Sequence, residues 1–536
     1  MPTLNWIGKE AVVNHDKEVP FKLLKKIKSA SVGESSQNLI IHGDNLEGLK
    51  ALIPYYHNKV KCIYIDPPYN TGNQSWVYND KVNSPKIKKW LGKVVGGEAE
   101  DLCRHDKWLC MMYPRLKLLK ELLSDDGIIF VSIDDNELYP LKVILDEIFN
   151  PTNFFTCLIW KGMHTVRNSS KDFNQNTEYI LVYAKDKTNL IKAGESKTYL
   201  RVPQDKEENY PYDDNDGNGK YKFDPLSARN PNTNYEFYFD KWNLKWRPPK
   251  GSFCRYSKET LQDMYEKNEI AYKESWKEPK AKRYLSRVQE GVPPSTLLPS
   301  ELVGFNKDGT SELGELFGNK VFDQPKPVSL IKYLLSIQRQ ADKNNKDYLV
   351  LDSFAGSGTT GHAVLQLNKE DGGKRKFILI QMDERLEEPI KTSDGKSLNT
   401  VIEVTRERIK RAIKKYEYNN GFEYCELSKP LFNEEGQIED ECIFEQLATY
   451  IYFTETQTNI DKKKISGNFI GDYNEKDLYL IFKEKGKNVL NKSFLSKIKK
   501  SENTKVIYAD RCLLDENALD EMNIRFKQIP YEVERY

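Results

Sequence analysis

Short apolar segments alternate with helical segments in two separate stretches of this 536-residue chain. The first stretch runs through apolar and helical segments in the order 38–43, 46–53, 61–65, 102–123 and 128–133, with Gly127 predicted to end its longest helix. The second stretch runs in the order 328–335, 348–351, 361–367, 377–381 and 405–415. Buried strands joined by helices form parallel sheets with helices on both faces. The pattern therefore predicts a doubly wound α/β, Rossmann-like sheet built from two parts of the chain.

The segments outside these two stretches differ in character. Residues 160–320 are rich in Pro, Asn, Asp, Lys and aromatic residues and show weak helical periodicity, which indicates an inserted, loop-rich unit. Strand-like pieces at 478–482 and 505–508 indicate an α+β domain towards the C-terminus. We expect five parts: an extension 1–36, a first half of the sheet 37–155, an insertion 156–322, a second half 323–416 and a C-terminal domain 417–536.

The composition excludes several classes of protein. No apolar run approaches the roughly 20 residues that a membrane helix needs, and residues 1–10 lack a secretory pattern. A cytoplasmic protein without membrane contact is therefore expected. The 8 cysteines include no C-x-x-C pair and the 6 histidines form no cluster, so we expect reduced thiols and no metal site. The net charge of +2 leaves nucleic-acid binding open, because binding requires only a local basic face.

A glycine-rich turn follows the apolar segment 348–351 and precedes a helical one. Gly356 and Gly358 permit close approach of the backbone to a ligand, and the helix N-terminus offers free N–H groups. A nucleotide-like cofactor would fit here, although an ordinary strand-to-helix turn has the same outline. A Walker phosphate loop is excluded because Thr359, not Lys, follows Gly358. The candidate cofactor residues are Asp352, Phe354, Ala355, Gly356, Ser357, Gly358 and Thr359.

A second candidate cofactor contact ends the following apolar segment. A carboxylate roughly 25 residues after a glycine turn can accept two hydrogen bonds from a ribose diol. Asp383 and Glu384 both lie near this spacing, and Glu384 is the residue that the family resemblance set out below implies.

The tetrapeptide Asp66-Pro67-Pro68-Tyr69 directly follows the apolar segment 61–65. Two prolines fix the backbone and remove its N–H donors, so the strand ends in a rigid lip of acceptors. The Asp66 carboxylate and the Pro67 carbonyl can both accept from one –NH2 group, while Tyr69 can stack on a planar base. This set suits methylation of an exocyclic amine, whose lone pair must be directed out of the ring. A simple strand-ending turn is the alternative, and it becomes weak once the glycine turn is considered together with the tetrapeptide.

These motifs resemble those of a known family. The glycine turn, with Asp352 and Phe354, is similar to the S-adenosylmethionine loop of amino-methyltransferases, and the tetrapeptide precedes it as in their circularly permuted β class. Further segments resemble the modification subunit of type III restriction–modification systems, namely residues 66–72, 108–116, 133–137, 177–183, 306–310 and 325–327. Solitary enzymes of that subfamily share these segments.

The resemblance implies a site-specific DNA adenine N6-methyltransferase that uses S-adenosylmethionine. It implies a target-recognition domain in the insertion, double-stranded DNA as substrate, a homodimer, and a separate restriction (helicase–nuclease) subunit as a candidate partner. In this superfamily Asp at the first position of the tetrapeptide goes with adenine N6 and Ser with cytosine N4, and this chain has Asp66. A solitary (orphan) adenine methyltransferase is the alternative, and a cytosine-N4 enzyme is less well supported.

Two further residues have two interpretations each. Asp44 could contact the cofactor's adenine or cap the helix that starts near Leu46, and the two roles are compatible. Lys326, between Pro325 and Pro327, lies where the family's last cofactor-contacting motif falls, but the segment could also simply precede a helix.

The insertion contains the candidate DNA-binding residues. Residues 234–250 interleave aromatic residues with Lys and Arg, a mixture that suits phosphate contacts and base readout. A strand with a packed aromatic face is the alternative for any one of them. The candidates are Tyr238, Trp242, Trp246, Arg247, Arg255 and Arg283. The C-terminal domain is expected to serve assembly.

Overall fold

The computed structural model describes residues 3–33, 37–71, 89, 92–94, 104–164, 173–193, 200, 202, 207–288, 291–338, 346–418, 421–483, 487–498 and 501–533. Gly72, part of one family-like segment, lies outside this range, as does part of the predicted extension 1–36. The chain forms two compact units, one made of Met1–Leu200 with Pro294–Tyr536 and the other of Arg201–Pro293.

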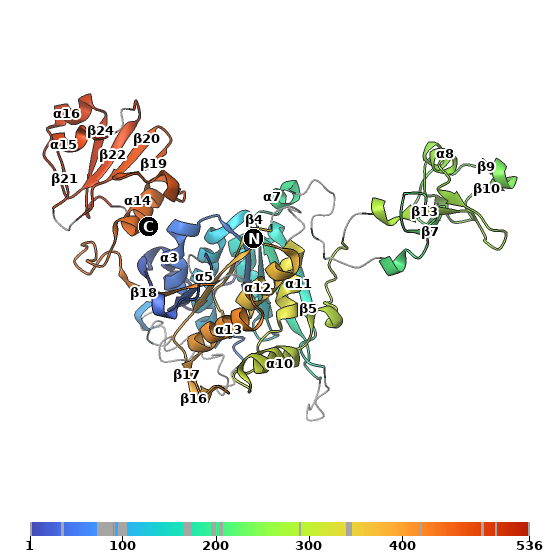
Figure 1. Ribbon diagram of the computed structural model, residues 1–536, viewed down its shortest axis with the longest axis horizontal. Coiled ribbons are helices and arrows are strands. Elements are labelled where there is room, and N and C mark those ends of the chain that lie inside the picture. Colours follow the sequence, from blue (N-terminus) through green and yellow to red (C-terminus); the bar gives the residue numbers. More distant parts are fainter. Residues whose placement is uncertain are drawn as a thin grey trace. The chain divides into compact units, whose positions relative to one another are not determined.

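A nine-stranded sheet forms the centre of the larger unit, in the order β1-β18-β2-β15-β14-β3-β4-β6-β5 (Figure 1). The six strands from β18 to β4 are parallel to their neighbours, and β1, β6 and β5 pair antiparallel at the two ends. The strands are β1 (Lys22–Lys26), β2 (Leu39–His42), β3 (Val60–Ile65), β4 (Leu123–Ile133), β5 (Phe154–Trp160), β6 (Glu178–Ala184), β14 (Leu349–Asp352), β15 (Lys376–Gln381) and β18 (Glu423–Pro430).

The two halves predicted from the sequence meet in the middle of this sheet. β14 pairs with β3 in parallel, with Leu351 opposite Ile63, and with β15 on its other side. The apolar side chains of these three strands are largely buried, as expected for a sheet covered on both faces. The doubly wound α/β fold with permuted halves is thus observed directly.

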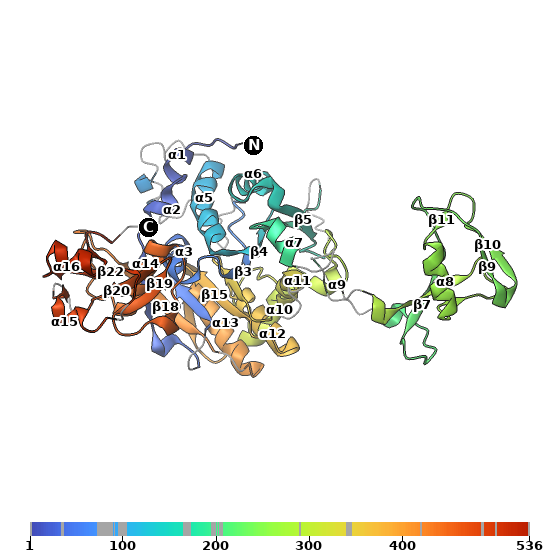
Figure 2. The same ribbon diagram turned by 90° about the horizontal axis from the view of Figure 1, so that it is seen from above.

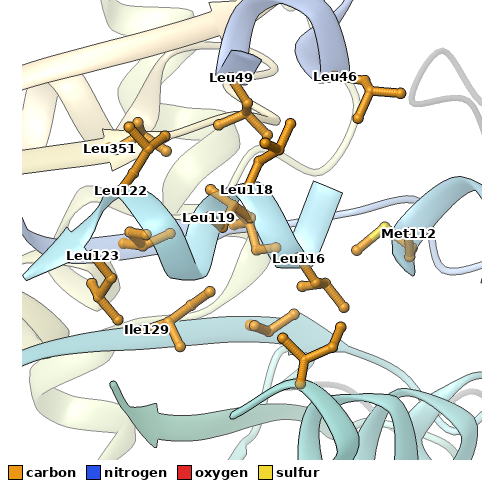
Figure 3. Packing of buried hydrophobic residues seen from close by; sticks show 14 of the residues in the cluster. Leu46, Leu49, Met112, Leu116, Leu118, Leu119, Leu122, Leu123, Ile129 and Leu351 are labelled. Carbon is orange, nitrogen blue, oxygen red and sulfur yellow. The ribbon is translucent and has the colours of Figure 1, made fainter. Parts of the chain in front are cut away.

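Helices cover both faces of the sheet. The larger helices are α3 (Asn45–Tyr56), α5 (Arg104–Leu122), α6 (Leu138–Phe149), α11 (Val328–Gln338), α12 (Thr359–Asp371) and α13 (Val401–Lys415). Figure 2 shows α5 and α6 on one face and α11, α12 and α13 on the other. Leucines of α3 and α5 interdigitate above β4 and β14, where Leu49, Leu119 and Leu351 are fully buried (Figure 3). This apolar packing fixes the sheet edge at which β3 and β14 end.

Gly127 does not end a helix as predicted. α5 ends at Leu122 and β4 starts at Leu123 with no intervening loop. Gly127 lies within β4, where the pairing with β3 shifts register, and an added Cβ would fall 2.7 Å from Leu123. The glycine is therefore explained by tight packing at an irregularity in the strand.

The compact smaller unit is narrower than the insertion 156–322 expected from the sequence. β5 and β6 lie in the main sheet, and Tyr183 of β6 is buried in the main core. The segment after the smaller unit also belongs to the larger one and contains α9 (Ser300–Val303) and α10 (Asn306–Phe317). β6 belongs to the larger unit because its apolar side chains are buried in the main core. The weak helical periodicity of the region gave no sign of this in the sequence.

The C-terminal region shares its first strand, β18, with the main sheet. It continues through α14 (Phe444–Thr456) into a four-stranded sheet, in the order β19-β20-β22-β24, with Tyr450, Ile470 and Val506 in a common core. Its other elements are β19 (Phe469–Tyr473), β20 (Lys476–Leu480), β21 (Val489–Leu490), α15 (Lys492–Leu495), β22 (Thr504–Ala509), β23 (Arg511–Cys512), α16 (Glu516–Glu521) and β24 (Ile524–Gln528). This is the expected α+β arrangement.

The smaller unit is built from short strands and one main helix around an aromatic core that includes Phe239 and Trp246. Its elements are β7 (Tyr221–Pro225), β8 (Ser227–Ala228), β9 (Phe237–Phe239), β10 (Leu244–Trp246), β11 (Phe253–Cys254), α8 (Lys258–Glu266), β12 (Ile270–Ala271) and β13 (Lys280–Tyr284). The larger unit also contains α1 (Lys9–Val12), α2 (His15–Glu18), α7 (Lys187–Ala193), β16 (Arg385–Lys391) and β17 (Ser397–Thr400). In the part of the chain that the structure describes, no helix is long and apolar enough to cross a membrane.

Candidate active site

The tetrapeptide and the glycine turn lie at one edge of the main sheet. Asp66 follows β3 and Ser353 follows β14, and these two strands are parallel neighbours. Both segments therefore leave the sheet at its carboxyl edge, where ligands of open α/β sheets bind. The sequence placed the motifs 286 positions apart (352 − 66), and the permuted strand order brings them together.

Both carboxylate oxygens of Asp66 accept hydrogen bonds from side chains of the protein. The Tyr69 hydroxyl lies 2.8 Å from Asp66 Oδ1, and Lys326 Nζ lies 2.8 Å from Asp66 Oδ2. Glu178, at the start of β6, shares these donors: its Oε2 is 2.9 Å from the Tyr69 hydroxyl and 3.2 Å from Lys326 Nζ. Burial, together with the neighbouring Asp66 and Glu178 carboxylates, raises the pKa of Tyr69 well above its usual value, so the phenol stays protonated.

The backbone of the tetrapeptide is held from α5 and from the loop before α6. The indole N–H of Trp108 donates to the Pro68 carbonyl at 2.6 Å. Asn70 has a positive φ of 60°, and its side-chain amide donates to Glu137 Oε1. His105 Nδ1 lies 2.6 Å from the same oxygen. Burial raises the pKa of Glu137, while the Asn70 and His105 contacts oppose that rise. These contacts fix the direction in which the tetrapeptide leaves β3.

Asp352 organises the glycine turn from its first position. Its carboxylate accepts from the Phe354 N–H at 3.0 Å and from the Thr360 hydroxyl at 2.6 Å. Burial raises the pKa of Asp352 to about 7, because these two hydrogen bonds only partly offset the loss of water. Asp352 therefore acts within the turn, tying its start to α12.

Two residues of α13, Thr405 and Arg408, donate hydrogen bonds to the turn. The Thr405 hydroxyl donates to the Gly356 carbonyl, and Arg408 Nη1 lies 2.8 Å from Ser357 Oγ and 2.7 Å from Thr359 Oγ1. Gly358 has φ +83°, and an added Cβ would fall 3.2 Å from atoms of Thr405. The close approach of α13 thus requires glycine at this position.

The surroundings of the turn contain groups suited to a polar ligand. The Ser353 hydroxyl is buried and has no hydrogen-bond partner among the described residues. Asp44 caps α3 by accepting from the Leu46 N–H at 2.8 Å, and Arg115 lies 3.3 Å from its carboxylate. The capping role considered for Asp44 is therefore observed. The next residue, Asn45, donates to the Ser353 carbonyl at 2.9 Å, which places the start of α3 beside the turn.

Glu384 and Asp383 follow β15, the strand next to β14. Asp383 is exposed, with Oδ1 4.0 Å from His42 Nε2, and Glu384 is half-buried. The Glu384 N–H donates to the Met382 carbonyl, and its own carbonyl accepts from Val401 N–H. The backbone of Glu384 is therefore fixed at the sheet edge where a cofactor ribose is expected.

The structure places Lys326 on the tetrapeptide. Its side chain is only 9% exposed, and its ammonium contacts Asp66, Tyr69 and Glu178. The segment also precedes α11, whose Val328 N–H donates to Glu312, as the alternative interpretation of this motif expected. The predicted cofactor contact of Lys326 stays a prediction. Sequence reasoning missed the supporting residues Trp108, Glu137, Glu178, Thr405 and Arg408. Three of them, Trp108, Glu137 and Glu178, lie in segments selected for their family resemblance, which was the available signal.

The candidate DNA-binding residues lie in the smaller unit and differ in exposure. Tyr238 is 52% exposed and Arg247 is also exposed, whereas Trp242 is half-buried. Arg255 and Arg283 both pair with Asp224 Oδ2, at 3.2 and 3.3 Å.

Trp246 differs from what the sequence suggested. It is 6% exposed and its indole N–H lies 3.2 Å from Glu278 Oε2. It packs in the core of the unit, because alternate residues of β10 face inward.

Comparisons with known proteins agree with the motifs. A family model described as DNA methylase matches residues 60–392. The chain is 35% identical over 420 residues to the type III restriction–modification enzyme StyLTI Mod subunit of Salmonella typhimurium, covering 74% of this chain and 61% of that protein. It is 35% identical to the EcoPI Mod subunit of Escherichia phage P1, covering 77% of this chain and 68% of that protein. The crystal structure of the M1.HpyAVI–SAM complex matches 69% of this chain and 98% of that chain, at 16% identity and a TM-score of 0.29.

Proposed function

The chain belongs to the DNA methylase family, together with the modification subunits of type III restriction–modification enzymes, and from this premise we propose that it is a site-specific DNA adenine N6-methyltransferase. One observation carries the proposal: Asp66–Tyr69 and the turn from Asp352 to Thr359 lie at one sheet edge, on parallel neighbouring strands. The chain spans 61% of the length of the StyLTI subunit, so the activity and partners of that complete enzyme are part of the proposal.

S-adenosylmethionine is the proposed cofactor, and it supplies an electrophilic methyl group carried on a sulfonium. The residues proposed to hold it are Asp44, Lys326, Asp352, Phe354, Ala355, Gly356, Ser357, Gly358, Thr359 and Glu384. The buried Ser353 hydroxyl, which has no hydrogen-bond partner among the described residues, fits a polar ligand lying against this turn. Half-buried Glu384 can accept from a ribose diol.

The tetrapeptide is suited to hold the target amine. The chain's own hydroxyl and ammonium donors already occupy both oxygens of Asp66, so this carboxylate binds O–H and N–H groups in this setting. An adenine amine can take one of these places, and Pro67 offers the second acceptor proposed from the sequence. Two acceptors would direct the nitrogen lone pair outward, towards the electrophilic methyl group that the cofactor would supply. Positioning accounts for most of the catalysis in such a transfer.

The base must leave the duplex to reach this edge, as is general for enzymes acting on bases. The smaller unit is proposed to recognise the DNA sequence. Tyr238, Trp242, Arg247, Arg255 and Arg283 are the proposed contacts. Trp246 supports this surface from the core instead of contacting DNA.

The proposed location, oligomeric state and partner subunit also follow from the family. We propose a cytoplasmic homodimer that modifies double-stranded DNA as the modification subunit of a type III system and joins a separate restriction (helicase–nuclease) subunit. An orphan adenine methyltransferase without that partner is the alternative. Light scattering of the purified chain, alone and with a co-expressed candidate restriction subunit, tests both assembly claims.

Analysis of the methylated product tests the central proposal. Purified chain is incubated with S-adenosylmethionine and unmodified genomic DNA, and the digested nucleosides are quantified. We expect N6-methyladenine, located by single-molecule sequencing at one short asymmetric motif, and we expect its rate of formation to fall at least about 100-fold with Asp66→Ala. N4-methylcytosine as the sole product, or no methylated base with a correctly folded chain, would refute the assignment.

A further inference from the structure

Two carboxylates, a phenol and an ammonium meet at the tetrapeptide, and only part of this group is explained by the proposed mechanism. Asp66 and Tyr69 follow β3, Glu178 starts β6, and Lys326 precedes α11. The side chains are poorly exposed: 20% for Asp66, 16% for Glu178 and 9% for Lys326. With both carboxylates ionised, the group carries one net negative charge.

Asp66 and Glu178 share the same two hydrogen-bond donors, Tyr69 and Lys326. Tyr69 has one hydroxyl hydrogen and lies within 2.9 Å of both carboxylates. Lys326 has three N–H donors, directed at Asp66, Glu178 and the Tyr69 oxygen. Either carboxylate can therefore accept from Tyr69 at a given moment, while Lys326 reaches both.

Glu178 is held independently of Asp66. Its Oε1 accepts from the Asn306 amide of α10 at 3.1 Å, and its backbone pairs with Trp160 of β5. The Oε2 atom is thereby fixed as an acceptor on the far side of Tyr69 and Lys326. Its position does not depend on whether Asp66 is engaged.

When the target amine takes the place of Tyr69 or Lys326 on Asp66, this exchange leaves the displaced donor in a buried site. An ammonium left without its carboxylate there is strongly unfavourable. Although burial lowers it, the pKa of Lys326 is raised above its usual value by Asp66 and Glu178, so the side chain remains charged. The displaced donors need a second acceptor.

We propose that Glu178 is a positioning residue for methyl transfer, retaining the Tyr69 hydroxyl and the Lys326 ammonium when the target amine replaces them on Asp66. This inference rests on the proposed function and adds a residue to it. Glu178 acts through Lys326 and Tyr69 and does not itself contact the reacting nitrogen.

The decisive variant is Glu178→Gln, which preserves size but lacks the second charged acceptor. We expect kcat to fall by about 10- to 100-fold, the loss typical of one charge-assisted hydrogen bond. The affinity for S-adenosylmethionine, measured by calorimetry, should stay within about threefold. Glu178→Asp should recover part of the loss because it keeps the charge.

Glu147→Gln is the matched control. Glu147 also accepts from one tyrosine hydroxyl, Tyr113, and one lysine ammonium, Lys9, both at 2.8 Å. These partners lie on α5 and α1, so the same loss of charge should leave kcat unchanged. A fall in kcat equal to that of Glu178→Gln would overturn the specific role of Glu178.

A double variant separates positioning from a merely structural contribution. In Glu178→Gln/Lys326→Met no ammonium remains to compete for Asp66, so kcat at saturating cofactor should exceed that of Glu178→Gln by about fivefold or more. Losses that simply add would overturn the proposal, as would wild-type kcat in a folded Glu178→Gln. Absence of methylated adenine with the wild-type chain would instead refute the proposed function itself.

Discussion

The tetrapeptide and the glycine turn end neighbouring strands of one sheet but are held in different ways. The tetrapeptide is held by side chains from distant segments, including Trp108, Glu178 and Lys326. The glycine turn is held by its own Asp352, by α13 through Thr405 and Arg408, and by single uncharged contacts such as that of Asn45 with the Ser353 carbonyl. The tetrapeptide thus has charged partners that can exchange, whereas the glycine turn has a fixed backbone conformation.

The difference corresponds to what each segment must do. A cofactor turn needs only to present the same backbone groups in every cycle, so hydroxyl contacts and steric fit are sufficient. In the proposed mechanism the tetrapeptide exchanges protein donors for a substrate amine, so its partners have to be able to exchange. Variants in the two regions should accordingly separate cofactor binding from methyl transfer.

The largest effect is expected for Asp66→Ala. Removing an acceptor used in the transition state typically lowers kcat by about 10²–10³-fold. Because Asp66 lies outside the glycine turn, the Kd for S-adenosylmethionine should change by less than about threefold. Radiolabel transfer to DNA and calorimetry measure the two quantities. Loss of cofactor binding in parallel with kcat would break the distinction between the regions.

Gly358→Val should show the opposite behaviour. At φ +83° a β-branched residue is strained, and its Cβ would press on Thr405 at 3.2 Å. Strain of this kind corresponds to roughly 5- to 100-fold weaker cofactor binding. Gly372→Val is the matched control, since Gly372 also has positive φ but an added Cβ meets nothing within 4 Å. Equal cofactor affinities for the two variants would contradict the claim that packing of Gly358 against α13 fixes the turn for cofactor binding.

Arg408→Met tests the support from α13. Losing its contacts to Ser357 and Thr359 should weaken cofactor binding about tenfold, the equivalent of one hydrogen bond to a charged group. Arg411→Met, on the same helix, instead removes pairs with Asp394 and Glu407. Calorimetry should show wild-type affinity for the Arg411 variant; a deficit equal to that of the Arg408 variant would argue against a specific role.

The smallest effect concerns stability. Because burial raises the pKa of Asp352 to about 7, the folded state binds more protons than the unfolded state between about pH 4 and 7. The stabilisation from the protonated Asp352 carboxyl is fully present below the pKa of Asp352 in the unfolded state, and it is lost as pH rises through the pKa of Asp352 in the folded state. The free energy of unfolding should fall by about 1 kcal/mol per pH unit within this window. Asp352→Asn should remove that slope in denaturant titrations, and an unchanged slope would exclude Asp352 as its source.

Local patterns in the sequence predicted the five central strands β2, β3, β4, β14 and β15, the helices α3, α5, α11, α12 and α13, the glycine turn and the tetrapeptide. The four outer strands β1, β18, β6 and β5 were not predicted. Strand periodicity and turn chemistry are properties of short segments, so they can be recognised without knowing the partners of those segments. The order of the motifs and their family resemblance also predicted the permuted fold and the proposed chemistry.

Only the tertiary structure decided how the tetrapeptide is held and where the units divide. Lys326 lies 260 positions after Asp66, and no local pattern predicts that its ammonium binds that carboxylate. Distances in the folded chain identify Glu178 as a further partner of Lys326, and burial identifies Trp246 as a core residue. The physical reason is that a buried charge or ring is stabilised by whichever groups the completed fold places beside it.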